Sequence, residues 1–261
     1  MNILYSHRLD KDNPGDLWST PKHYFFDDIK CDVVDVFKDN NFTKTYDSYI
    51  TGGGDILVSD KWLTFNKRIL DKIKTKVNIV WGAGVNFDHL GIKEYLKSFN
   101  LIGTRTFKKE YSDIRYSFVP CSSVMNTIFD KEVKEDKQVS LIHHFKRPLD
   151  INLSYLSIKN KPNNLEEVVN TIATSKTIIT NSYHAAYWSM ILNKRTIVMI
   201  EHPNCKLSTF KYKPYSYQKG NFDVTLLDED YDYKHVKEEF RDLNLDFYKK
   251  VKDEYKSYNN I

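Results

Sequence analysis

The residue with the clearest chemical potential is His184. The apolar run Thr177–Thr180 predicts a strand, and Ser182–Leu192 predicts a helix that begins directly after it. Ser182 is a residue type that caps helix N-termini, which places His184 in the first turn. Unpaired backbone N–H groups and the helix dipole favour an anion there, and a histidine can bind phosphate or donate a proton. The alternative is a histidine that is hydrogen-bonded in the core or helps to cap the helix.

Glycine-containing loops also follow predicted strands. They comprise Asn13 to Asp16 with Gly15, then Gly52, Gly53, Gly54 and Asp55, and then Gly82 and Gly84. Glycines permit tight turns and let backbone N–H groups approach an anion closely. None of these loops matches the dinucleotide fingerprint or the P-loop, so neither dinucleotide nor ATP binding is predicted. Ordinary turns are the alternative, whereas Asp16 can bind sugar hydroxyls or act as a base.

Basic side chains near predicted strand ends are candidates for holding an acidic substrate. Arg105 follows the predicted strand Leu101–Gly103, and an arginine can pair with carboxylate or phosphate through two hydrogen bonds. His143 and His144 are adjacent, so on a strand they point to opposite faces and at most one faces a cleft. No second histidine or cysteine stands at metal-ligand spacing, so no metal site is predicted.

The elements that position these residues alternate along the chain between strand-like apolar runs and helix-like amphipathic runs. That order predicts an α/β protein with parallel strands. The predicted strands are Asn2–Ser6, Cys31–Phe37, Ser48–Thr51, Val77–Trp81, Leu101–Gly103, Arg115–Pro120, Val139–His143, Ile151–Ile158, Thr177–Thr180, Thr196–Ile200 and Phe222–Leu227. The other predicted helices are Trp62–Ile73, Ile92–Phe99 and Leu165–Thr174, the last capped by Asn164.

Two lobes are expected, because residues 130–137 are almost all charged, which predicts a linker between two lobes. We predict a first lobe over residues 1–130, a second over residues 138–230, and a long amphipathic helix over residues 234–258 that packs across them. Ligands of open α/β sheets bind beyond the carboxyl ends of the strands, so the loops after the strands are the expected sites.

Composition limits the class of protein. The chain has 261 residues, and 41% of them are hydrophobic, which is enough to form a core. Its net charge of +4 is too small to indicate a nucleic-acid-binding protein. Its three cysteines are widely spaced, which fits a reducing compartment, and neither a signal peptide nor a membrane span is apparent. We therefore predict a cytoplasmic protein. The segment Lys206–Lys219 interleaves lysines with aromatic residues. It predicts either a peripheral contact with anionic lipid headgroups at the inner face of the membrane or with a lipid-linked diphosphate, or an ordinary solvated loop.

Several motifs coincide in order with those of one family. The sequence resembles the polysaccharide pyruvyl transferases over roughly residues 10–200. The matching segments are Asn13–Asp16, Gly52–Asp55, Trp81–Val85, Gly103–Arg105, Val119–Cys121, Ile142–Phe145, Asn181–Ala186 and Lys194–Val198. The resemblance implies two Rossmann-like lobes of the GT-B kind, the first on the acceptor side and the second on the donor side.

The resemblance also implies a chemistry. The donor is phosphoenolpyruvate as a co-substrate with no further cofactor, the acceptor is a sugar or a lipid-linked glycan precursor, and the product is a pyruvyl ketal. His184 is the implied general acid, Arg105 the implied clamp for the donor carboxylate, and the other implied donor-binding residues are His144, Asn181, Ser182 and Tyr183. Many members have an arginine at the position of Ser182, so either other groups meet the donor charge or the donor differs. The alternatives are a glycosyltransferase that uses a nucleotide sugar and a glycan-binding relative without activity.

Overall fold

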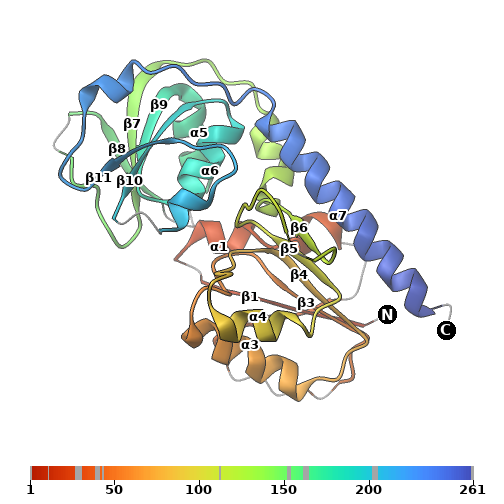
Figure 1. Ribbon diagram of the computed structural model, residues 1–261. Coiled ribbons are helices and arrows are strands. Elements are labelled where there is room, and N and C mark those ends of the chain that lie inside the picture. Colours follow the sequence, from red (N-terminus) through yellow and green to blue (C-terminus); the bar gives the residue numbers. More distant parts are fainter. Residues whose placement is uncertain are drawn as a thin grey trace. The chain divides into compact units, whose positions relative to one another are not determined.

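Two compact units, each with its own sheet, make up the chain in the computed structural model (Figure 1). The structure describes residues 2–10, 12–26, 31–38, 42, 44–111, 113–151, 154–160, 165–201 and 205–259. Among these, residues 2–10, 16–125 and 240–259 form the first unit, and residues 12–15 and 126–239 form the second. The predicted two-lobed α/β fold with parallel sheets and a long C-terminal helix is confirmed.

The first unit contains a six-stranded parallel sheet. Its order is β2 (Cys31–Asp35), β1 (Ile3–His7), β3 (Ser48–Gly52), β4 (Val77–Ala83), β5 (Leu101–Thr104) and β6 (Tyr116–Phe118). The chain leaves β1 toward β2 on one side and later continues through β3 on the other. The strand order therefore reverses between β1 and β3, and this switch point is where parallel sheets usually bind ligands.

Both faces of this sheet are covered. Alternation along β1 sends Leu4 to one face and Ile3 and Tyr5 to the other, and all three are buried. The helices α3 (Asp60–Lys72) and α4 (Leu90–Leu96) supply Leu63, Ile69, Ile92, Tyr95 and Leu96 to the Leu4 face. The short helix α2 (Lys22–Phe25) and the long helix α7 (Val236–Asn259) supply Phe25, Phe247, Val251 and Tyr255 to the other.

The helix α7 confirms the predicted C-terminal helix. From Phe240 onward it belongs to the first unit. Its buried Asn244 accepts a hydrogen bond from Trp81 Nε1 at 3.2 Å, and the hydroxyls of Tyr255 and Ser48 lie 3.0 Å apart. These bonds supply partners for polar groups that the apolar face of the helix would otherwise bury alone. Among the described helices, none is both long and apolar enough to cross a membrane.

The second unit contains a five-stranded parallel sheet. Its order is β11 (Tyr215–Gln218), β10 (Arg195–Ile200), β9 (Ser175–Thr180), β7 (Lys137–His144) and β8 (Leu156–Asn160). The helices α5 (Leu165–Thr174) and α6 (Tyr183–Ile191) join β8 to β9 and β9 to β10. All nine residues of α6 are buried. The strand order reverses between β7 and β9, which places a second switch point there.

Some predicted elements were wrong. The last strand is β11 and not Phe222–Leu227, where Val224–Leu227 forms the 3₁₀ helix η5. Only Tyr217 of β11 is buried, so this edge strand has no apolar run, whereas Phe222 and Leu227 pack on the core without strand pairing. The loop expected after β1 contains the short helix α1 (Pro14–Trp18), for which proline is a suitable first residue. The predicted cap Asn164 lies outside the described residues.

Candidate functional site

The switch point of the second unit brings together the loops that follow β7 and β9. His144 is the last residue of β7, and its backbone N–H donates to Asn181 Oδ1 at 2.6 Å. The same amide donates from Nδ2 to the carbonyl oxygen of Arg147 at 3.0 Å. Asn181, only 6% exposed, thus ties the two loops to each other. The sequence-predicted residues His144 and Asn181 meet here because their strands are neighbours in the sheet.

His184 is the second residue of α6 and is almost wholly buried, at 5% exposed. Its ring lies edge-on to Tyr183, with centroids 5.3 Å apart, and is tilted against Trp188 at 5.6 Å. Tyr183 in turn stacks on Phe210 at 4.5 Å. Gly15 belongs to the same unit, and a Cβ atom there would overlap Nδ1 of His184. The predicted glycine loop and the predicted histidine are therefore in direct contact.

Ser182 occupies the N-cap position of α6 with an extended backbone, but its side chain makes no capping hydrogen bond, which corrects the expected cap. Instead, its hydroxyl accepts a hydrogen bond from Asn160 Nδ2 at 2.8 Å. Asn160, the last residue of β8, is 3% exposed and pairs in register with His144. Sequence reasoning missed Asn160 because the predicted strand ended at Ile158. A polar residue directly after a strand was the signal for it.

Positive charge gathers around His144. Burial, and to a smaller extent the charges of Arg147, Lys206 and Lys146, together lower the pKa of its imidazole to about 4. Arg147 also forms an ion pair with Glu201, with a shortest N–O distance of 2.8 Å. Because Glu201 directly follows β10, this pair joins the loop after β7 to the segment after β10, where Lys206 opens the 3₁₀ helix η4 (Lys206–Thr209). The sequence assigned Lys206 to a lysine-rich loop and not to the site.

Replacing Lys206 by Met is expected to raise the pKa of His144 from about 4 toward the ordinary histidine value, because a neighbouring cation disfavours the imidazolium. The pKa should stay below the ordinary histidine value, since burial is the larger cause of the lowering. Titration of the imidazole nitrogens by NMR measures the change. The matched control is Lys219→Met, an exposed lysine in the same unit, which should leave the titration unchanged.

The rest of the segment Lys206–Lys219 packs within the second unit. Lys211 and Tyr212 both bond to the carboxylate of Glu239 in the first turn of α7. Phe210 and Tyr217 are buried. Its aromatic and basic side chains therefore serve the packing of this unit in part.

The adjacent histidines differ in environment, as the predicted alternation requires. The Nε2 of His143 lies 2.5 Å from the hydroxyl of Ser157 on β8, and its Nδ1 accepts from the Leu149 backbone at 2.7 Å. Both ring nitrogens of His143 are thus engaged in contacts near the edge strand β8, whereas the pKa of His144 is affected by three cations.

In the first unit the glycine loops converge with Asp16 and Arg105. Arg105 Nη2 lies 2.8 Å from Asp55 Oδ1, and a Cβ atom on Gly84 would overlap the same carboxylate. A Cβ on Gly54 would come within 3.0 Å of Asp16 Oδ1. The φ angles of Gly53, Gly54 and Gly82 are 71°, 76° and 65°, in the region that favours glycine, and Gly52 lies against the backbone oxygen of Trp81.

Replacing Arg105 by Met is expected to destabilise the fold by about 3 kcal/mol, because it leaves the partly buried carboxylate of Asp55 without its cation. The side chains of Arg105 and Asp55 are 2% and 22% exposed. The free energy of unfolding, measured by urea denaturation, tests this. The double variant Arg105→Met/Asp55→Leu should recover part of the loss, and a single variant as stable as the wild type would contradict the prediction.

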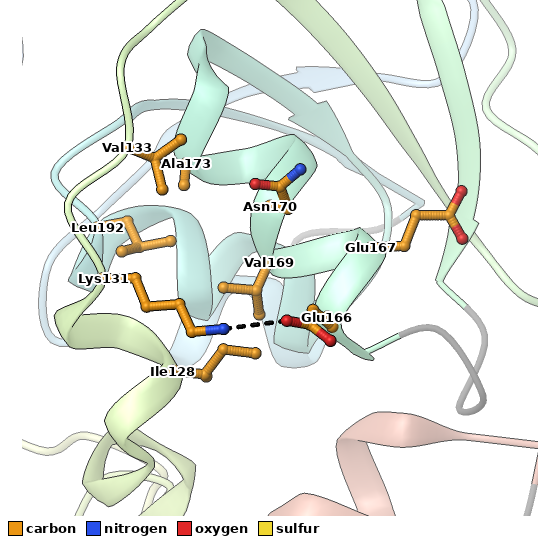
Figure 2. A pocket seen from close by; sticks show the side chains of 9 residues that line it. All are labelled: Ile128, Lys131, Val133, Glu166, Glu167, Val169, Asn170, Ala173 and Leu192. Atoms are coloured by element: carbon orange, nitrogen blue, oxygen red, sulfur yellow. Dashed lines mark hydrogen bonds and ion pairs between the residues drawn. The ribbon is translucent and has the colours of Figure 1, made fainter.

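A separate pocket lies on the second unit between α5 and residues 128–133, with a volume of about 460 Å³ (Figure 2). Its lining is mostly apolar, and Lys131 and Glu166 form an ion pair across it at 3.0 Å. None of the sequence-predicted site residues lines this pocket. Within the described ranges of the chain, no group of three or more histidine, cysteine or acidic side chains is arranged to hold a metal ion.

Both the sequence and the fold are similar to those of known proteins. Residues 3–203 match the family described as polysaccharide pyruvyl transferase. A search of curated proteins finds no match. Among solved structures, one of a protein of uncharacterized function from Klebsiella pneumoniae is similar, with a TM-score of 0.52 and 13% identity over 78% of this chain and 85% of that one. That likeness concerns the fold alone. Because the family match covers most of the chain, including His144 and His184, the chain belongs to the polysaccharide pyruvyl transferase family, which is a family of enzymes.

Proposed function

We propose that this chain transfers the pyruvyl group of phosphoenolpyruvate to a sugar of a surface polysaccharide or of a lipid-linked glycan precursor. Two hydroxyls of the sugar add to C2 of the enol, C3 gains a proton and becomes a methyl group, and phosphate leaves. Of the two hydroxyl protons, one balances the new C–H bond and the other leaves with the phosphate. Such a reaction needs a proton donor at C3 and cations for the phosphate and the carboxylate.

The observation that carries this proposal is the switch point of the second unit. The pKa of His144 there is lowered by the charges of Lys146, Arg147 and Lys206. Arg147 also pairs with the carboxylate of Glu201. The backbone N–H groups that open α6 add a partial positive charge. This excess of positive charge supports a donor with several negative charges, and the cations can take the place of the arginine that the family often has at Ser182.

His184 is the proposed general acid. It lies in the first turn of α6, and its contact with Gly15 holds the ring in one position. A proton donor must be fixed relative to the carbon that it protonates, because a small displacement removes most of its effect. In this proposal Asn181 and Ser182 position the loop and the start of the helix, His144 and Tyr183 line the donor site, and the cations bind the phosphate.

The first unit is the proposed acceptor side. Asp16 is the proposed ligand or base for sugar hydroxyls, beside the glycine triplet. Arg105 remains the proposed clamp for the donor carboxylate, and its ion pair with Asp55 gives it a structural role as well. The three cysteines form no disulfide, which supports a cytoplasmic location for the reaction.

Incubation with each donor class tests the function. The purified chain is mixed with phosphoenolpyruvate, or separately with nucleotide sugars, together with a panel of hexosides and nucleotide-linked sugars as acceptors. Release of inorganic phosphate with a product heavier by one pyruvyl ketal supports the proposal. Release of a nucleotide supports a glycosyltransferase instead, and binding of a sugar without turnover of either donor supports a glycan-binding role.

A further inference from the structure

A histidine without a role in the proposed reaction, His7, lies at the switch point of the first unit. His7 is the last residue of β1, and its carbonyl oxygen accepts a hydrogen bond from Val36 at 3.0 Å. The neighbouring strand β3 ends in the glycine triplet, of which Gly53 lies against Ser19 and Gly54 against Asp16. His7 therefore occupies in the first sheet the place that His144 occupies in the second, at the carboxyl end of the first strand beside the reversal of strand order.

The side chain of His7 is buried with one nitrogen unpaired. The residue is 3% exposed, and within the part of the chain that the structure describes, its Nδ1 has no hydrogen-bond partner. Burial and, to a smaller extent, the nearby His23 lower the pKa of the imidazole to about 4, against the smaller opposing effects of Asp35 and of the Asp16 and Arg8 backbones. The ring is thus neutral at pH 7. The Asp16 and Arg8 backbones raise the pKa through hydrogen bonding, as carbonyl oxygens do when a ring N–H donates to them. Because Nδ1 makes no bond, we assign that N–H to Nε2, which leaves Nδ1 with a lone pair that can accept.

A buried acceptor without a partner destabilises the fold unless something donates a hydrogen bond to it. Phosphoenolpyruvate is fully ionised near neutral pH and offers no donor, whereas every sugar hydroxyl can donate. The missing partner of Nδ1 therefore has the chemistry of a hydroxyl.

The charges near the two switch points support the same choice. At the switch point of the first unit two described cations pair with carboxylates, since Arg8 lies 3.6 Å from Asp35 and Arg105 lies 2.8 Å from Asp55, and the carboxylate of Asp16 lies beside Gly54. In the second unit three cations act on His144. A site whose cations are paired with carboxylates suits a neutral polyhydroxyl ligand.

We infer that, on the proposed acceptor side, Nδ1 of His7 accepts a hydrogen bond from a hydroxyl of the acceptor sugar. This rests on the proposed function for the identity of the ligand as an acceptor. His7 then adds to Asp16 a second group that orients hydroxyl oxygens, and it is specific for a ligand that donates.

The test follows the imidazole nitrogens of the full chain by long-range ¹H–¹⁵N NMR. The probes are the methyl glycosides of glucose, galactose, mannose and N-acetylglucosamine, added one at a time, and phosphoenolpyruvate alone. We expect at least one glycoside to shift the His7 Nδ1 resonance, and phosphoenolpyruvate to shift His144 instead. His7→Phe should weaken glycoside binding about tenfold, the usual effect of losing one neutral hydrogen bond. His7→Asn keeps an amide that can accept and should weaken it less.

The matched control is His89→Asn in the same unit. His89 stands at the N-cap of α4, where its ring accepts from Ile92 at 3.3 Å, and asparagine is also a good cap. This variant should bind glycosides like the wild type. The inference is overturned if no glycoside shifts the His7 resonance, in which case an internal water is the partner, or if His7→Phe binds glycosides unchanged. If His7→Phe does not fold, the wild-type spectra and His7→Asn still decide. Since glycoside binding needs no donor, failure of phosphoenolpyruvate turnover would count against the proposed function and not against this site.

Discussion

His184→Gln is expected to lower the rate of pyruvyl transfer by about 10²–10⁴-fold, the usual contribution of a positioned general acid. Glutamine is similar in size to histidine but cannot act as an acid, so the contacts with Tyr183 and Trp188 change little. Binding of phosphoenolpyruvate should stay within a few-fold of the wild type, because the cations near His144 remain. Phosphate release under saturating donor measures the rate, and isothermal titration measures binding of the donor.

The matched control for this variant is His235→Gln, which replaces an exposed histidine of the same unit. It should keep full activity. If His184→Gln is folded, as judged by circular dichroism, and transfers pyruvate at the wild-type rate, His184 is not the proton donor. If instead the variant loses donor binding in parallel with its rate, His184 acts as a ligand of the donor and not as its acid.

Gly15→Ala is expected to lower activity at least about a hundredfold and to destabilise the fold by about 1–3 kcal/mol. The new methyl group would overlap Nδ1 of His184, so either the start of α1 or the imidazole must move. A displacement of about 1 Å at a catalytic group is enough for a loss of that size. The rate of phosphate release and the midpoint of urea denaturation measure the two effects.

Two further variants separate this contact from a general effect of adding a methyl group. In Gly91→Ala, within α4, the nearest atom outside the backbone is Leu63 Cδ2 at 3.0 Å, the end of a flexible side chain. It should keep activity and gain slightly in helix stability. The double variant Gly15→Ala/His184→Ala should lose less free energy of unfolding than the two single variants lose together. The reason is that alanine at position 184 vacates the space that the methyl group at position 15 needs. Additive effects would show that Gly15 and His184 are not in contact.

The elements of the fold were largely predictable because their signals are local. The continuous apolar run Val77–Trp81 predicted the central strand β4, and Leu165–Thr174 predicted α5 with both ends correct. The prediction failed at β11, because an edge strand that buries only Tyr217 has no apolar pattern to detect. It also failed at Ser182, whose residue type suits a cap but whose hydroxyl pairs with a residue on another strand.

The site residues divide in the same way. The order and the spacing of the motifs around Gly15, His144 and His184 were sufficient to indicate the family, and the family match confirms it. Asn160 was missed because the predicted strand ended two residues too early, and Lys206 was missed because nothing within a few residues distinguishes it from an ordinary polar position. Their importance comes from neighbours far away along the chain, at Ser182 and His144.

The sequence by itself therefore determined most of the strands and helices and the residue types at the strand ends, since these depend on periodicity and on short-range preferences. Only the tertiary structure decided which strand ends meet: β1 beside β3 in one sheet and β7 beside β9 in the other. Strand order is set by pairing between distant segments, and the neutral state of His7 and of His144 is set by burial and by charges that the fold brings near. Neither the strand order nor the protonation state of these histidines can be predicted from residues that are neighbours in the chain.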